Sequence, residues 1–129
     1  MLAFKEEEVA LRRLDSYLAQ IARELERPPS NADGAADSAP RARVLIKIDT
    51  EGSECEVLRG ARCVIEKYRP VIVFECFPGE RRKPVMDYFA GVHYDVFSLP
   101  WRLVAPTQPL ASEVFLTNRA TNFLAMHRG

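Results

Sequence analysis

The sequence contains no long hydrophobic run. Its longest apolar stretches extend over about five residues, as in Pro70-Val71-Ile72-Val73-Phe74, whereas roughly 20 are needed to cross a bilayer. The amino-terminal segment MLAFKEEEVALRR carries acidic side chains where a secretory signal has its apolar core. We therefore expect a cytoplasmic protein with neither a membrane segment nor an export signal.

A surplus of charge of either sign is also absent. The 18 Lys and Arg residues balance the 18 Asp and Glu residues, so no broad basic field is available. This balance argues against extended binding to nucleic acid or to an anionic membrane surface. The length of 129 residues is that of one modest domain, which we expect to cover residues 1–129.

Cysteine and histidine are scarce and badly spaced for metal binding. Cys55, Cys63 and Cys76 are odd in number and lack the C-x-x-C spacing, and His93 and His127 lie far apart. Zinc and redox sites require closely spaced ligands. We expect free, buried or half-buried thiols and no metal site.

Alternating strand and helix signals run along the chain. Branched apolar runs predict strands at 44–48, 71–77, 94–99 and 122–126, and a weaker alternation predicts one entering at Glu8. Helical spacing predicts helices at 14–25, capped by Asp15 or Ser16, and at 84–91. An S-x-x-E capping box, Ser53 to Glu56, predicts a third helix that extends to Tyr68. Residues 28–42, rich in Pro, Ala, Asp and Ser, predict a flexible loop.

This order of elements predicts an α/β fold. Strands separated by long crossovers that contain helices form parallel sheets with helices on both faces. The runs at 44–48 and 71–77 are almost continuously apolar, which is typical of strands covered on both faces. Lys47 is the exception, and we expect it to extend to solvent or to pair with Asp49 or Glu75.

Carboxylates gather where two of these strands end. Asp49, Glu51 and Glu54 surround the turn after the first buried strand, Glu75 ends the next, and Gly52 permits a tight turn. Ligands of open α/β sheets bind beyond the carboxyl ends of the strands. Such a group is able to bind a cation, to accept hydrogen bonds from a ligand or to act as a base. The alternative is that the glutamates only complement a helix dipole and that Asp49 and Glu51 are solvated turn residues.

An ordered series of motifs resembles one family. Lys47-Ile48-Asp49-Thr50-Glu51-Gly52-Ser53-Glu54 and Val57-Leu58-Arg59-Gly60-Ala61 are similar to the KIDVEGxE-xxVLxGA signature of FkbM-family methyltransferases. Arg69-Pro70-Val71-Ile72-Val73-Phe74-Glu75 resembles the family's next strand. His93-Tyr94-Asp95-Val96 and Asn122-Phe123-Leu124-Ala125 resemble two later segments, and residues 9–18 resemble the stretch before the signature.

The resemblance implies a Rossmann-like, S-adenosylmethionine-dependent methyltransferase that acts on hydroxyl groups of small molecules such as sugars or polyketides. It implies catalytic roles for Asp49, Glu51 and Glu75, and a cofactor-binding role for Asp49, Gly52 and Glu54. Methyl transfer to a hydroxyl needs a group that takes the proton, and Asp49 or Glu51 is the candidate base. No metal is implied.

One part of the family pattern is missing. None of the six glycines makes the G-x-G of the family's cofactor loop; they are Gly34, Gly52, Gly60, Gly79, Gly91 and Gly129. The acidic residue expected on the ribose hydroxyls is also lacking. We therefore expect a partial methyltransferase sheet, mostly parallel with an antiparallel last strand, that corresponds to the carboxyl-terminal part of the domain.

A partial sheet has a physical consequence. The strand at 44–48 has the apolar composition of a central strand but would lie at the edge of a partial sheet. An exposed edge of this kind tends to pair with other strands. We expect the chain to pair with another copy or another polypeptide, to be a piece of a longer product, or to have rearranged its sheet. The alternative function is a non-catalytic α/β interaction module that does not bind the methyl donor alone.

Overall fold

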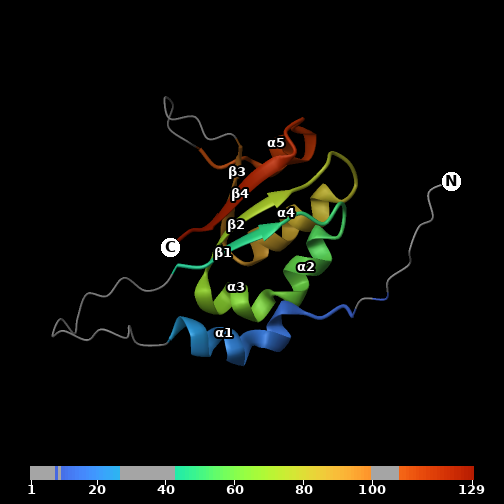
Figure 1. Cartoon of the computed structure of the whole chain (residues 1–129). Coiled ribbons are helices and arrows are strands. Elements are labelled where there is room, and N and C mark those ends of the chain that lie inside the picture. The colour runs from blue at the N-terminus through green and yellow to red at the C-terminus, as the bar shows by residue number, and fades with distance from the viewer. Residues whose placement is uncertain (1–7, 9, 27–42, 100–107) are drawn as a thin grey trace.

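A four-stranded mixed sheet forms the centre of the protein. The computed structural model describes residues 8, 10–26, 43–99 and 108–129. Within these, β1 (Leu45–Ile48), β2 (Val71–Glu75), β3 (Tyr94–Ser98) and β4 (Asn122–His127) lie in the order β1-β2-β4-β3 (Figure 1). β1 pairs with β2 in parallel, and β4 is antiparallel to both β2 and β3. The predicted antiparallel last strand is therefore confirmed, and β1, β2 and β3 share one direction. Because β4 lies between β2 and β3, two of the three pairings in the described residues are antiparallel, so the sheet is mixed and not mostly parallel as predicted.

The helices cover one face of this sheet. They are the 3₁₀ helix η1 (Leu14–Tyr17) and the α-helices α1 (Leu18–Leu25), α2 (Glu54–Gly60), α3 (Arg62–Tyr68), α4 (Arg82–Gly91) and α5 (Ser112–Thr117). α2 to α5 contribute buried side chains to one core with the strands, and α1 lies outside α3 as an outer layer (Figure 1). The prediction of helices on both faces is wrong for the described part of the chain. None of the helices described there is long and apolar enough to span a membrane.

The alternation of side chains along the strands explains this arrangement. Ile48, Ile72 and Phe74 are at most 3% exposed and point to the helices. Lys47, which is exposed, and Glu75, which is half-buried, point the other way. The predicted burial of β1 and β2 on both faces is thus wrong. The covered face is filled by a stack of aromatic rings, with Phe74 5.1 Å from Phe89 and 5.5 Å from Phe123 between ring centres.

The amino-terminal segment docks on the helix layer through a cap. Its predicted strand is wrong for the residues described there, since Glu8 and residues 10–13 form no strand; Val9 lies outside the described residues. Asp15 does not cap its own helix. Its carboxylate accepts hydrogen bonds from the backbone N–H groups of Cys63 (2.9 Å) and Val64 (3.0 Å), at the start of α3. These donors have no partner within their own helix, so Asp15 satisfies them across the fold.

Two further local predictions are corrected. The Ser53–Glu56 capping box is wrong, since the Ser53 side chain makes no cap hydrogen bond, and the helix divides at Ala61 into α2 and α3. α5 was not predicted, because its six residues are too short for a clear helical period. The predicted loop at 28–42 lies outside the described residues.

A buried arginine joins the loop after β2, the helix α5 and the segment before β4 at one end of the sheet. Arg82 is 0% exposed, and its guanidinium donates to the backbone carbonyls of Cys76 (3.0 Å), Phe77 (3.3 Å) and Phe115 (2.7 Å). It also donates to the carbonyls of Asn118 and Ala120. Its carbon Cζ lies 5.3 Å and 5.0 Å from the ring centres of Phe115 and Phe123. Carbonyl oxygens and ring faces therefore replace water around the charge.

Arg82→Met should destabilise the protein by at least about 3 kcal/mol, because several buried carbonyls would lose a charged donor. The measurement is urea denaturation followed by circular dichroism. Lys83→Met is the matched control, since Lys83 is exposed and makes only a surface ion pair with Asp87. Equal losses in both variants would contradict a structural role of Arg82.

Candidate functional site

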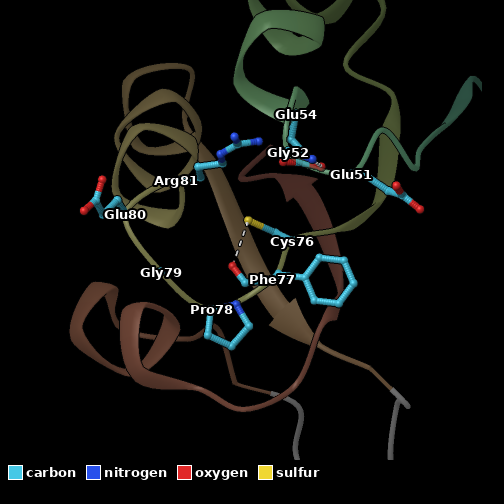
Figure 2. Close-up of a pocket in the computed structure, with 9 residues that line it drawn as sticks. All are labelled: Glu51, Gly52, Glu54, Cys76, Phe77, Pro78, Gly79, Glu80 and Arg81. Carbon is cyan, nitrogen blue, oxygen red and sulfur yellow. Dashed lines mark hydrogen bonds between the residues drawn. The ribbon is translucent and has the colours of Figure 1, made fainter.

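A cleft opens at the carboxyl ends of the two parallel strands. Its volume is about 480 Å³, which is within the range of small-molecule sites. One wall is the turn after β1 and the other is the loop after β2 (Figure 2). The lining residues are Glu51, Gly52, Glu54, Cys76, Phe77, Pro78, Gly79, Glu80 and Arg81. The structure thus places a cleft at the strand ends where the sequence predicts a site.

The turn after β1 is held by a buried carboxylate. Glu54 is 3% exposed, and its Oε1 accepts hydrogen bonds from the backbone N–H of Gly52 (2.8 Å) and the Thr50 hydroxyl (3.4 Å). The backbone is left-handed at two successive residues, with φ of +48° at Glu51 and +111° at Gly52. Glycine adopts such angles without strain, and glutamate rarely does. Through its hydrogen bonds to Gly52 and Thr50, Glu54 fixes the turn that forms this wall of the cleft.

The loop after β2 brings a cation over that turn. Arg81 extends across the cleft toward Gly52 and Glu54, while the carboxylates of Glu51 and Glu80 point outward (Figure 2). The approach is so close that a Cβ on Gly52 would lie 1.5 Å from the Arg81 Nη1 atom. Gly52 thus provides both the turn and the space in which the guanidinium lies. The charge of Arg81 is the one cation among the residues that line this cleft.

Asp49 and Glu75 form a carboxylate pair beside the cleft. They follow Ile48 and Phe74, which are register partners on β1 and β2 and point into the core. Side chains alternate along strands, so the pair lies at the sheet face that carries no helix in the described residues. A hydrogen bond with Asp49 raises the pKa of Glu75, burial and the charges of Asp49 and Glu51 raise it further, and Lys47 lowers it. Glu75 thus binds its proton more readily than an ordinary glutamate, chiefly because Asp49 lies beside it.

The thiol in the cleft is not prepared for nucleophilic chemistry. Cys76 is 1% exposed, and burial raises the pKa of its thiol; Glu54 raises it further, and Arg82 lowers it. A thiol of raised pKa stays protonated at neutral pH. Cys55 and Cys76 are buried and free, as predicted, but Cys63 is free and exposed. No group of three or more His, Cys, Asp and Glu that could hold a metal ion occurs among the described residues.

The five predicted site residues fall into two groups. Gly52 and Glu54 build the cleft wall together with Glu51, whereas Asp49 and Glu75 meet at the neighbouring sheet face. Glu51 connects the groups, since it lines the cleft and its charge acts on Glu75. Their catalytic and cofactor-binding roles stay predictions. The proposed contribution of Trp101 to an acceptor pocket lies outside the described residues.

Arg81 and the loop that carries it were missed at the sequence level. The available signal is positional: Pro78-Gly79 ends the second buried strand, and the charged residues Glu80, Arg81 and Arg82 follow directly. The rule that ligands bind beyond the carboxyl ends of strands applies to this loop as well as to the first. The sequence does not show that Arg82 is buried and Arg81 exposed, because that difference depends on where α4 begins.

Fold and cleft together define an α/β protein with a cleft at the ends of its parallel strands. The family model of the methyltransferase FkbM domain matches residues 3–96, more than two thirds of the chain. The chain therefore belongs to the FkbM methyltransferase family, and the resemblance is confirmed for the motifs that lie within residues 3–96. The resemblance of Asn122-Phe123-Leu124-Ala125 stays a prediction, since this segment lies outside the matched span. The matched span contains every residue of the cleft and the Asp49–Glu75 pair. Neither a curated protein nor a solved structure gives a match to the chain.

Gly52→Ala should destabilise the protein by about 1–2 kcal/mol, because alanine is strained at this positive φ. It should also displace the Arg81 side chain, which is flexible and exposed. Thermal unfolding measures the first effect. Gly91→Ala is the control, since a Cβ added there would meet nothing within 4 Å and the φ of Gly91 is not positive. A Gly52→Ala variant as stable as Gly91→Ala would contradict the geometry of the turn.

Glu75→Gln should stabilise the protein at neutral pH. The folded-state pKa of Glu75 is raised, so its ionisation costs stability as the pH increases through that pKa. Glutamine keeps the hydrogen-bonding shape and removes this cost. The gain should vanish as the pH falls below about 4.3, the ordinary pKa of glutamate. Urea denaturation at several pH values measures it, and a gain independent of pH would contradict the carboxylate pair.

Proposed function

We propose that the cleft binds S-adenosylmethionine and that the domain transfers its methyl group to a hydroxyl of a small metabolite. The observation that carries this proposal is the position of Arg81 over Gly52, between two acidic loops at the strand ends. Membership of a methyltransferase family supports the reaction class. The acceptor class, a sugar, polyketide or other hydroxylated compound, comes from the family resemblance.

The cleft residues fit the chemical groups of this donor. A guanidinium binds a carboxylate through charged hydrogen bonds, so Arg81 would hold the carboxylate of the methionine part. The acidic side chains near the turn favour its ammonium and sulfonium charges. Phe77 is 54% exposed in the cleft lining and offers an apolar ring face to the adenine. When bound, the donor supplies an electrophilic methyl group.

The Asp49–Glu75 pair supplies the base in this proposal. A hydroxyl must lose its proton as its oxygen becomes methylated, and a carboxylate within reach accepts it. The pKa of Glu75 is raised by Asp49. The proton of the acceptor oxygen would therefore move toward a carboxylate that binds protons more readily than an ordinary glutamate. Glu51, held at a left-handed φ that costs stability, is the second candidate for contact with the acceptor.

Calorimetric titration of S-adenosylmethionine, or of its demethylated product, into the purified chain tests donor binding. We expect saturable binding that Arg81→Met weakens by about tenfold, which corresponds to the loss of roughly one charged hydrogen bond. Arg62→Met is the control, because Arg62 is exposed on α3 and pairs with Glu66. Absence of heat at millimolar ligand would contradict donor binding and favour the non-catalytic interaction module.

Turnover with a panel of hydroxylated acceptors tests the base. Asp49→Asn should reduce turnover strongly while leaving donor affinity unchanged, and Glu51→Gln should reduce it less. Formation of the demethylated donor is the measurement. Unchanged turnover in both variants would exclude these carboxylates from the reaction.

A further inference from the structure

The edge of the sheet at β1 is open in the described residues, where β1 pairs only with β2. The backbone N–H of Val71 donates to the carbonyl of Val44, so the backbone groups of Val44 and every second residue after it face β2. The polar backbone groups of Leu45, Lys47 and Asp49 consequently face outward. We call residues 43–49 the open edge.

The side chains of the open edge are unusual for an unpaired strand. Leu45 is 67% exposed, and of the features that normally protect a free sheet edge, which are charges, proline and bulges, β1 itself carries only the charge of Lys47. Arg43 and Asp49 at its two ends carry opposite charges. A strand with a positive start and a negative end is complementary to an antiparallel copy of itself.

We propose that a second copy of this chain pairs with the open edge, antiparallel and around a twofold axis that passes beside Ile46. Ile46 then faces its own copy once, on the axis. Leu45 lies opposite Lys47 and Arg43 lies opposite Asp49, and each of these two pairs occurs twice. The axis is perpendicular to the sheet, so both copies keep their helices on the same face and form one continuous sheet. The aliphatic stem of Lys47 covers the exposed Leu45 of the other copy.

The other twofold registers are less favourable. An axis beside Lys47 places two lysines directly opposite each other, and like charges destabilise a cross-strand pair. An axis beside Ile48 extends the pairing to Glu51, where φ of +48° has already turned the chain away from the strand direction. The register around Ile46 pairs the open edge with itself from end to end and matches its charges.

Pairing in this register also affects the candidate site. Arg43 of the second copy would lie opposite Asp49, which interacts with Glu75. The carboxylate pair would then face a cation from the other copy in addition to Lys47 of its own strand. The inference does not depend on donor binding, because it uses only the edge and its charges.

Sedimentation velocity from roughly 10 μM to roughly 1 mM tests the pairing. We expect a dimer whose dissociation constant increases at least about tenfold in Leu45→Lys, which sets lysine against Lys47 of the other copy. Val114→Lys is the matched control, since Val114 is also an exposed apolar side chain (48%) but lies on α5. It should leave the dimer unchanged.

A charge exchange tests the register. Arg43→Glu should weaken the dimer, and the double variant Arg43→Glu with Asp49→Arg should restore it, because the two charges meet only in the proposed pairing. Failure of the double variant to restore it would overturn the register. A monomer over the whole concentration range would overturn the proposal. Hydrogen exchange on that monomer would then show whether another segment of the same chain protects the amides of Leu45 and Lys47, and the proposal would be overturned in either case.

Discussion

A buried charge must find hydrogen-bond partners where it lies, and this constraint organises the cleft end of the protein. The guanidinium of Arg82 binds backbone carbonyls from the loop after β2, from α5 and from the segment that leads into β4. Glu54 acts in the same way on the turn after β1. Each wall of the cleft is thus fixed by a buried ionisable side chain, Glu54 on one side and Arg82 on the other. The cleft is preorganised because its loops satisfy charges that have no water around them.

The uneven cover of the sheet separates the packed core from the carboxylates of the candidate site. The face under the helices contains the aromatic core, and the arginine that stiffens the loops stacks on two of its rings. The other face carries Lys47, Asp49 and Glu75 beside the strand ends. Asp49 makes the ionisation of Glu75 more costly there, and a carboxylate kept at such a cost is typical of functional positions and not of packing.

The strands β1, β2, β3 and β4, the helices between the first three of them, and the position of the carboxylates after β1 and β2 were readable from local patterns. Branched apolar runs determine β1, β2 and β3 because few other structures bury them. The predictions of helix caps failed for a physical reason. Asp15 looks like the cap of its own helix and caps α3 instead, and Ser53 looks like a cap and makes no such bond. A capping side chain is defined by the donors that it reaches, and those depend on packing between segments far apart in the sequence.

The sequence by itself determined the family, the acidic turn and the alternation of strands and helices, since each depends on residues close together in the chain. Tertiary structure alone decided which face of the sheet the helices cover, that Arg82 is buried while Arg81 lies over Gly52, and that Asp49 meets Glu75 across two strands. The physical reason is the range of the interactions. Hydrophobic period and turn chemistry act within a few residues, whereas burial of a charge and sharing of a proton require partners that only the folded chain brings together.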